Sequence, residues 1–179
     1  MPEYTSPMAT AVQLPVSEYL RTTYRPDREY IDGELRERNV GKWEHARLQM
    51  LLAAWFVQHE PEWNITGSTE QRTQVASRRV RIPDLVILRA GRQPAVLVDP
   101  PLLVIEILSP EDTYSELQER CEDYLRMGVE TIWLIDPATR SGRMCTAAGW
   151  VAAERLEVAG TPIYADLAPL FAQIQSPSK

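Results

Sequence analysis

Two short apolar runs separated by a helix-like segment constrain the fold of this chain most. Residues 102–108 (LLVIEIL) and 130–136 (ETIWLID) carry mostly apolar side chains at successive positions, so both faces of each run are expected to be buried. Strands of this kind are typical of parallel neighbours, which need a long crossover connection such as a helix. A helix over about residues 113–127 would supply it. The segment 102–136 is therefore expected to form a strand–helix–strand unit with two adjacent parallel strands.

Turn and capping residues set the limits of the other expected elements. Pro61 is expected to stop the helix before it, Asp112 or Thr113 to cap the helix at 113–127, and Gly128 to end it. We also expect helices at 16–24, 42–59 and 165–174, a hairpin within 28–40 turning at Asp32-Gly33, strands at 64–75 and 79–88 turning near Ala76-Ser77, and a hairpin around Ser141-Gly142. This order predicts an α/β fold with a mixed sheet and helices on both faces. Residues 1–14 are expected to be a flexible tail and residues 15–179 one domain.

Composition excludes several classes of protein. Hydrophobic residues make up 44% and charged residues 25% of the chain, which is ordinary for a globular protein and excludes a disordered one. The formal charge of -6 argues against a protein that coats nucleic acid non-specifically, although an enzyme needs only a local basic rim. Cys121 and Cys145 have no zinc spacing, and no apolar stretch is long enough to span a membrane. We expect a cytoplasmic protein with reduced thiols.

Two acidic residues stand where a core should be apolar. Asp84 opens the strand in RIPDLVILR, and Glu106 interrupts the aliphatic run LLVIEIL. A buried carboxylate needs a cation or strong donors, and two of them on adjacent strands repel each other. A divalent metal such as Mg²⁺ would answer both requirements. The alternative is that Asp84 caps the start of a strand and Glu106 pairs with an arginine in the interior.

The helix after Glu106 adds a third candidate element. Glu116 and Arg120 are spaced i, i+4 and so share one helix face, which a tight Ser-Pro turn would bring back over the end of the strand. Arg120 could there contact a phosphate. The alternative is an ordinary surface ion pair.

Several other histidines, arginines and tryptophans could have either a functional or a structural role. His45 stands at a helix start near a possible pocket, whereas His59 on the same face is expected to be structural. Three arginines before Asp84 either contact a phosphate backbone or keep a hairpin in solution: Arg78, Arg79 and Arg81. Three tryptophans are expected to pack in the core rather than stack on bases: Trp55, Trp63 and Trp133.

Several short motifs in a fixed order resemble one known family. They are PD at 83–84, ExxSP at 106–110, YLRMGV at 124–129 and IWLIDP at 132–137, with REYIDGEL at 28–35 upstream. This set resembles the Uma-type restriction endonucleases of the PD-(D/E)xK nuclease superfamily, over about Val16–Pro137. The resemblance implies a restriction endonuclease-like fold, a mixed β-sheet core with helices on both faces, and Mg²⁺- or Mn²⁺-dependent hydrolysis of DNA.

The resemblance also assigns roles to individual residues. Asp84 and Glu106 would be metal ligands, with the carbonyl of Ile107 as a third. Glu34 and His45 match positions that line the same pocket. The family commonly has a lysine four residues before the tyrosine of the following helix, and often an aspartate four residues earlier still. These two positions are Arg120, before Tyr124, and Glu116.

The arginine at position 120 separates two hypotheses. Arginine cannot lose its proton in a protein, so Arg120 could hold and stabilise the scissile phosphate but could not activate water. The base would then be a metal-bound hydroxide, a carboxylate such as Glu34 or Glu116, or the substrate phosphate. The first hypothesis is a metal-dependent DNA endonuclease, expected to be a homodimer because cleaving a duplex takes two active sites or two visits. The second is a non-catalytic nucleic-acid-binding or scaffold protein.

Overall fold

The computed structural model describes residues 13–39 and 41–174 of the 179-residue chain. The helices are α1 (Val16–Arg21), α2 (Trp43–Trp63), α3 (Tyr114–Met127) and α4 (Leu167–Ala172). The strands are β1 (Arg28–Ile31), β2 (Glu34–Glu37), β3 (Ile65–Thr69), β4 (Thr73–Ala76), β5 (Arg79–Arg81), β6 (Leu85–Arg89), β7 (Leu103–Ile107), β8 (Ile132–Asp136), β9 (Ser141–Thr146), β10 (Gly149–Ala152), β11 (Arg155–Glu157) and β12 (Tyr164–Asp166).

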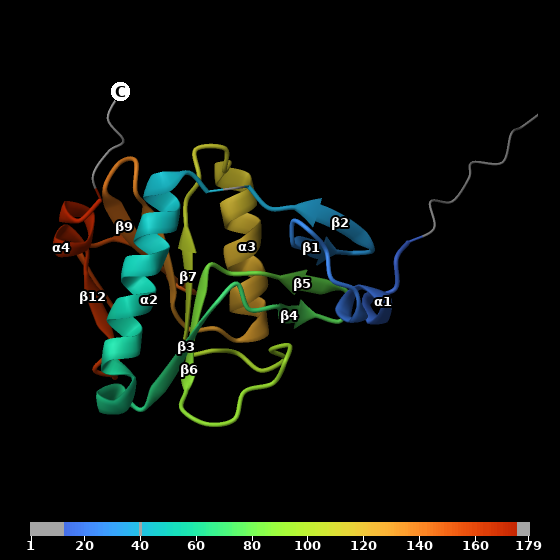
Figure 1. The fold of residues 1–179 in the computed structure, drawn as a ribbon, viewed down its shortest axis with the longest axis horizontal. Coiled ribbons are helices and arrows are strands. Elements are labelled where there is room, and N and C mark those ends of the chain that lie inside the picture. Colours follow the sequence, from blue (N-terminus) through green and yellow to red (C-terminus); the bar gives the residue numbers. More distant parts are fainter. Residues whose placement is uncertain (1–12, 40, 175–179) are drawn as a thin grey trace, which may run out of the picture.

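A six-stranded sheet in the order β10-β9-β8-β7-β6-β3 forms the centre of the fold (Figure 1). Strands β7 and β8 are parallel, with Val104 opposite Ile132 and Ile107 opposite Ile135, whereas the other pairs in this sheet are antiparallel. Helix α3 joins β7 to β8. The strand–helix–strand unit predicted from the two apolar runs is thus confirmed, together with the mixed sheet.

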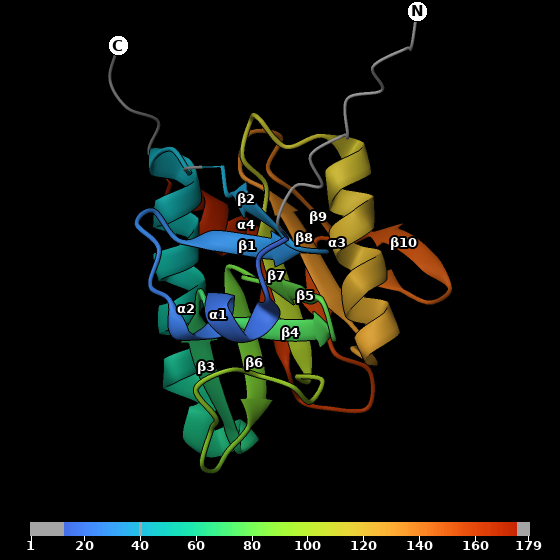
Figure 2. The same ribbon diagram turned by 90° about the vertical axis from the view of Figure 1, so that its right-hand side faces the viewer.

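Helices cover both faces of this sheet. On one face α2 and α4 pack against alternate residues of β7 and β8, among them Ile105 and Trp133. On the other face Cys121 and Tyr124 of α3 pack against Val104 and its neighbours. Figures 1 and 2 show α2 and α3 on opposite sides of the sheet. Among the helices in the described ranges, none is long and apolar enough to cross a membrane.

A smaller sheet lies beside α3, on the side away from the six-stranded sheet. Its strand order is β2-β1-β5-β4, and α1 packs against it through Tyr19, which is fully buried beside Tyr30. The β1–β2 turn falls at Asp32-Gly33 as expected, with positive φ at both residues. A third, two-stranded sheet pairs β11 with β12.

The expected N-terminal tail lies mostly outside the described residues, which begin at 13. Leu14 belongs to the fold, because its N–H donates to the Gly33 carbonyl at 3.2 Å and its carbonyl accepts from the Tyr30 hydroxyl at 2.7 Å. The single domain over residues 15–179 stays a prediction.

Pro61 does not stop α2, contrary to the sequence-based expectation. The helix continues to Trp63 and ends at Asn64, which is left-handed and donates its N–H to the Glu60 carbonyl. A proline in the last turn removes only one backbone hydrogen bond of the helix. Trp63 compensates by burying its ring, 8% exposed, against Phe56.

The two strands expected at 64–75 and 79–88 are each broken in two. The first splits where Glu70 takes a positive φ, and the second splits at Pro83, which has no N–H for a ladder bond. The halves β4 and β5 belong to the smaller sheet and meet at the expected Ala76-Ser77 turn, while β3 and β6 belong to the central one. Asp84 therefore lies at the junction of the two sheets.

Smaller differences have local causes. Thr113 rather than Asp112 caps α3, through a capping box with Glu116. α1 ends at Arg21 because Thr22 is extended. The turn expected at Ser141-Gly142 lies just before these residues, which begin β9. A Cβ at Gly142 would stand 2.3 Å from a methyl group of Leu167 in α4, so a larger residue there would require the Leu167 side chain to shift.

Candidate active site

Asp84 and Glu106 lie side by side on one face of the central sheet. Leu85 of β6 pairs with Ile105 of β7, so the next position along this antiparallel pair brings Asp84 beside Glu106. Because side chains alternate across a strand, both acids face α3, opposite the face to which Leu85 and Ile105 contribute. Asp84 is 2% exposed and Glu106 is 3% exposed. The two acids singled out in the sequence are therefore buried neighbours.

Asp84 is held as an anion by three donors. Its Oδ1 accepts from Arg38 Nη2 at 2.8 Å and lies 3.4 Å from His45 Nε2, and its Oδ2 accepts from the Ile107 N–H at 2.7 Å. Burial alone would raise the pKa of Asp84, but the hydrogen bond and charge of His45, the charge of Arg38 and the Ile107 N–H outweigh it and lower the pKa. Asp84 is thus ionised at neutral pH.

At Glu106, in contrast, the effect of burial on the pKa outweighs the effect of its hydrogen-bond and charge partners. Its Oε1 accepts from the Tyr124 hydroxyl at 2.6 Å, and its Oε2 lies 3.7 Å from Arg120 Nη1. Burial, together with the charge of Asp84, raises the pKa of Glu106 to about 7 against the opposing effects of Arg120 and Tyr124. The pair thus joins a carboxylate that keeps its charge to one that takes up a proton near neutral pH.

Asp112 completes the ring of charges around the two acids. Arg120 Nη2 lies 3.2 Å from Asp112 Oδ1, while Asp112 Oδ2 accepts from the Ser109 N–H at 2.7 Å. The Ser109 hydroxyl lies 3.4 Å from His45 Nδ1. Burial would lower the pKa of Arg120, but the charges of the surrounding acids raise it, so the guanidinium stays charged. Arg120 points into the site rather than to bulk water, as the sequence predicts.

These groups surround a small cavity whose donors suit a divalent cation. The cavity, about 10 Å³, has room for the centre of one water-sized sphere. Asp84, Glu106 and Ile107 all line it, and the Ile107 carbonyl points to the same side of β7 as the N–H that Asp84 accepts from. Carboxylate and carbonyl oxygens with retained waters are what Mg²⁺ prefers. In the part of the chain described, no three His, Cys, Asp or Glu side chains form a metal-binding group, so such an ion would depend on two carboxylates, one carbonyl and water.

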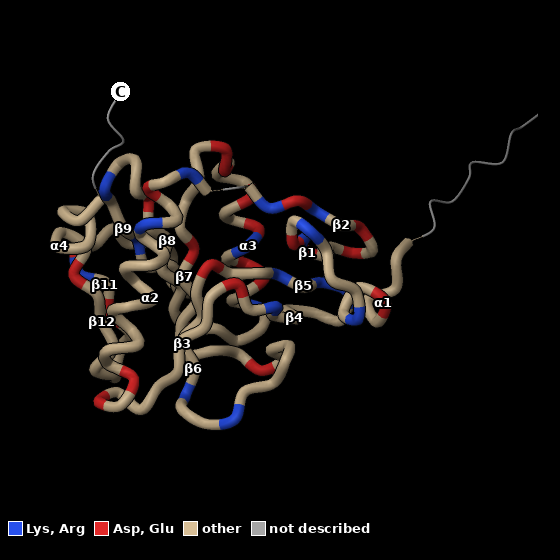
Figure 3. Tube along the Cα trace, viewed as in Figure 1, with Lys and Arg blue, Asp and Glu red and all other residues tan. Residues whose placement is uncertain are grey.

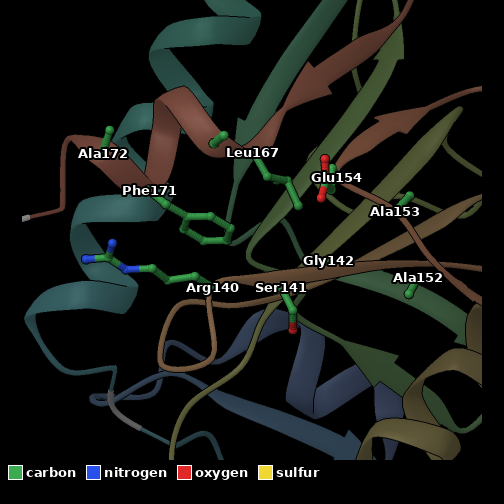
Figure 4. A pocket seen from close by; sticks show the side chains of 10 residues that line it. Arg140, Ser141, Gly142, Ala152, Ala153, Glu154, Leu167, Phe171 and Ala172 are labelled. Carbon is green, nitrogen blue, oxygen red and sulfur yellow. The ribbon is translucent and has the colours of Figure 1, made fainter.

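A larger cavity of about 480 Å³ opens beside the small one. The two share His45, Ser109 and Asp112, and the larger one adds two cations, Lys42 and Arg140, and two acids, Glu44 and Asp136. The larger cavity therefore adjoins the small one and carries charges of both signs on its wall. Another cavity, of about 650 Å³, lies between β9, β10 and α4 and shares no residue with the small one (Figure 4).

Two candidates from the sequence stand apart from this cavity. Glu34 is exposed at the start of β2, and Glu116 is exposed in the first turn of α3, where its carboxylate accepts from the Thr113 N–H and hydroxyl. These hydrogen bonds lower the pKa of Glu116. The alternative, a surface ion pair between Glu116 and Arg120, is not formed, because Arg120 turns to Glu106 and Asp112. Neither glutamate lines the small cavity.

The upstream arginines form a buried ion network that sequence analysis missed. Arg81, 2% exposed, binds Glu29 Oε2 at 2.7 Å and Asp123 Oδ2 at 2.7 Å, and Arg79 binds Asp123 at 3.0 Å. Figure 3 shows basic positions of β5 beside acidic positions of α3. Neither expected role, phosphate contact or solubility, describes Arg81, which is buried, whereas Arg79 is partly exposed and Arg78 is exposed. The signal was present: Arg79 and Arg81 share a strand face, and Glu119 and Asp123 share a helix face.

The remaining candidates pack as expected. His59 stacks on Trp63 at 4.2 Å between ring centroids, and its Nδ1 lies 2.8 Å from the Trp55 carbonyl. Trp133 is fully buried in the core. Arg38, absent from the sequence-based candidates, is the cation closest to Asp84.

Comparison with known proteins agrees with this architecture. A family model named Uma2, described as "Putative restriction endonuclease", matches residues 16–171. A crystal structure described as "a putative nuclease belonging to DUF820", from Anabaena variabilis, superposes with a TM-score of 0.75 at 18% identity and covers 89% of this chain and 98% of that one. A cryo-EM structure of a DrdV–DNA complex matches with a TM-score of only 0.41, at 18% identity over 74% of this chain and 12% of that one. No curated protein matches. Since the family model spans most of the sequence and the fold is shared over nearly the whole of a solved relative, the chain belongs to the Uma2 family.

Proposed function

We propose that this protein is a metal-dependent endonuclease that hydrolyses phosphodiester bonds in DNA. One observation carries the proposal: two buried neighbouring carboxylates, with pKa values shifted in opposite directions, converge on one small cavity beside two arginines and a histidine. Groups whose pKa values are driven apart in this way are typical of active sites. Membership of the Uma2 family supports the same activity.

Asp84, Glu106 and the Ile107 carbonyl would hold one Mg²⁺ or Mn²⁺. A bound ion of this kind supplies charge stabilisation at the phosphate and activates a water molecule. In the metal-free protein Arg38 neutralises Asp84, and Arg120 neutralises Glu106. When a cation takes over the two acids, the guanidinium groups become available to a phosphate, for which their planar fork is well suited.

His45 is the group placed to handle a proton. It lines both the small cavity and the larger one, with Nε2 toward Asp84 and Nδ1 toward Ser109. Burial would lower the pKa of His45, but the hydrogen bond and charge of Asp84 raise it, which favours the imidazolium. The imidazolium can hold a phosphate oxygen or protonate a leaving oxygen. The proposal uses neither Glu34 nor Glu116.

A second candidate function is nucleic-acid binding or scaffolding without catalysis. The observation that favours it is the internal charge balance of the site, where each acid already has a cationic partner. Among the described side chains no buried nitrogen or oxygen lacks a hydrogen-bond partner. A site complete without a metal is compatible with a family member that has lost turnover.

Metal binding separates the two functions most directly. Isothermal titration of the full chain with Mn²⁺ should show one site, which Glu106→Gln removes and Asp99→Asn retains. Asp99 is an exposed acid in the loop before β7 and serves as the matched control. Absence of Mn²⁺ binding to the wild type, or equal binding to Glu106→Gln, would reject the metal site and leave the second function.

Plasmid nicking then tests turnover and the part played by Arg120. We expect Mg²⁺- or Mn²⁺-dependent nicking of supercoiled DNA, lowered at least about tenfold in Arg120→Ala, the loss of roughly 1.4 kcal/mol of transition-state stabilisation. Arg120→Lys should nick DNA faster than Arg120→Ala does, because lysine keeps a cation at the phosphate. Equal nicking by wild type and Arg120→Ala would remove Arg120 from the mechanism.

A further inference from the structure

Tyr114 and Trp150 form a pair of partly exposed aromatic rings that the proposed function does not use. Tyr114 is the first residue of α3 and is 69% exposed, and Trp150 lies half-buried in β10. Their ring centroids are 5.2 Å apart and their planes are inclined by 49°. Figure 2 shows α3 and β10 side by side, on the side of the molecule away from α2. Because the rings are tilted, ring surface remains open to solvent, and we call these two residues the aromatic pair.

Both rings are held by regular structure rather than by a loop. Trp150 lies opposite Cys145 of β9, and its side chain packs against the core on the α3 face of the central sheet. The backbone of Tyr114 is fixed at the start of the helix by the capping box of Thr113 and Glu116. An aromatic surface that is fixed in advance loses little conformational entropy when it binds another flat ring.

The aromatic pair lies close to the candidate site. Tyr114 follows Asp112, which lines both cavities, by two residues, so their Cα atoms are at most about 7 Å apart. Leu108 connects the two regions, because it lines the larger cavity and packs against the same core cluster as Trp150. A distance of about 7 Å corresponds to about two steps of a stacked nucleotide strand. A strand with a phosphate at the candidate site can therefore place a neighbouring base at the aromatic pair.

Arg143 adds a cation between the aromatic pair and the candidate site. On β9 it shares the α3 face with Cys145, two positions away, so it is a diagonal neighbour of Trp150. It lies opposite Leu134 of β8, two residues before Asp136, which lines the larger cavity. Arg143 is exposed and, among the residues that the structure describes, has no hydrogen-bond or ion-pair partner. Its guanidinium is therefore available to a phosphate group.

The acids of this region are turned away or already bonded. Glu122, on the same flank of α3 as Tyr114, lies two turns further along and is hydrogen-bonded to two neighbours on the helix. Glu111, three residues before Tyr114, is paired with Lys42. Glu154, which follows β10, lines the cavity on the opposite, α4 face of the sheet. A nucleic-acid strand on the α3 face would thus meet the aromatic rings and Arg143.

We propose that the aromatic pair is a stacking site for one unpaired base of the DNA strand that is cut, with Arg143 on the phosphate beside that base. Aromatic side chains commonly hold single-stranded nucleic acid in this way, and stacking tolerates any base. Bases inside a duplex are stacked on each other, so the strand must be unpaired or distorted at this point. The preferred substrate is therefore DNA with unpaired nucleotides beside the cleaved bond. The inference rests on the proposed function, because that function supplies the strand.

Fluorescence anisotropy of a labelled oligo(dT) of about 12 nucleotides, titrated with the full chain in EDTA, tests the stacking site without cleavage. Tyr114→Ala and Trp150→Ala should each weaken binding by about tenfold, whereas Tyr114→Phe and Trp150→Phe keep a ring and should lose far less. Val151→Ala is the matched control, because Val151 is 61% exposed beside Trp150 but faces the other side of β10. A wild type that does not bind, or alanine variants that bind as the wild type does, overturns the proposal.

An abasic strand separates stacking from a disturbance of the fold. An abasic strand of the same length should bind the wild type at least about tenfold more weakly than oligo(dT), and the alanine variants should bind it as the wild type does. Arg143→Gln should weaken the binding of both strands and lower the slope of log K against log salt concentration by about 0.7. Alanine variants that lose as much affinity for the abasic strand as for oligo(dT) would refute stacking.

Further outcomes keep the stacking site apart from the proposed function. Oligo(dT) binding that depends on the aromatic pair, in a protein that nicks no DNA with Mn²⁺, would reject the endonuclease and support the stacking site. Mn²⁺-dependent nicking, with oligo(dT) binding unchanged in Tyr114→Ala, would support the endonuclease and reject the stacking site. A duplex bound as tightly as the single strand would also overturn it. So would a Tyr114→Ala variant in which only the oligomeric state changes, because the aromatic pair would then belong to a protein interface.

Discussion

Replacing Glu106 by glutamine should raise the stability of the metal-free protein relative to the wild type as the pH rises from 4 to 8. Burial, with the charge of Asp84, raises the pKa of Glu106 to about 7, against the opposing effects of Arg120 and Tyr124. As the pH rises, the carboxyl ionises in the unfolded chain near its usual pKa of 4.5, whereas the folded protein keeps its proton until about pH 7. The folded state then binds more protons than the unfolded state, so stability falls as the pH rises through this window.

The size of this effect follows from the two pKa values. The interval from 4.5 to about 7 corresponds to about 3 kcal/mol of stability, at about 1.36 kcal/mol for each pH unit. Glutamine keeps an oxygen for the Tyr124 hydroxyl but cannot ionise, so the variant escapes this loss. At pH 4 Glu106 is mostly protonated in both the folded and the unfolded state. The variant and the wild type then differ in free energy of unfolding only through side-chain shape and hydrogen bonding. Between pH 4 and pH 8 this difference in free energy of unfolding should move by about 3 kcal/mol in favour of the variant.

Urea unfolding followed by tryptophan fluorescence measures this difference, because Trp133 is fully buried in the core. The experiment uses EDTA and the two pH values given, which avoid the sequence isoelectric point of about 5.0. Glu130→Gln, which removes one carboxylate at an exposed position just before β8, is the matched control. If the difference in free energy of unfolding between Glu106→Gln and the wild type is the same at both pH values, or shifts in favour of the wild type at pH 8, the raised pKa of Glu106 is refuted.

Three further outcomes follow from the same contacts. Asp84→Asn should destabilise the metal-free protein by about 2–4 kcal/mol in urea unfolding at pH 7, because it leaves Arg38 without its anion, and an unchanged midpoint would contradict the contact. This reverses the sign expected from carboxylate repulsion alone. The stabilisation from Asp84 should be lost as the pH falls through its lowered pKa, so the gap between the two proteins should close in acid. Arg81→Met should lower the free energy of unfolding by about 3–5 kcal/mol, because it leaves the buried carboxylates of Glu29 and Asp123 without this cation. Arg126 also contacts Asp123 but is 61% exposed, so the control Arg126→Met should lower it by less than about 1 kcal/mol.

The central fold could be predicted from the sequence because its signals are local. The runs 102–108 and 130–136 and the helix between them have the periodicity and end signals of their structures, and β7, α3 and β8 lie within one or two residues of the prediction. The prediction of unbroken strands at 64–75 and 79–88 was wrong because it too used only local signals. Their alternation continues through Glu70 and Pro83, but the chain there changes from one sheet to another, and that choice depends on distant partners.

The candidate site was predictable only where a residue violated its local pattern. Asp84 and Glu106 were found because an acid in an apolar strand needs an explanation. Their partners carry no such signal, since an arginine in a polar hairpin is unremarkable, and Arg38 meets Asp84 across 46 positions of sequence. Glu116 was misplaced because spacing shows which helix face a residue shares but not whether a capping box holds its carboxylate.

The arginine at position 120 makes physical sense together with Asp112. One nitrogen of its guanidinium lies 3.7 Å from Glu106 and the other lies 3.2 Å from Asp112, so a planar fork bridges two acids that a single ammonium group would serve less well. We therefore expect Arg120→Lys to lower stability in urea unfolding by about 1–2 kcal/mol at pH 8, because Asp112 loses its cation. Asp112→Asn should remove most of that penalty, so that Arg120→Lys costs less in the Asp112→Asn background than in the wild type. Equal losses in the two backgrounds would mean that Arg120 and Asp112 do not act as a pair, and the bridging explanation for this departure from lysine would be wrong.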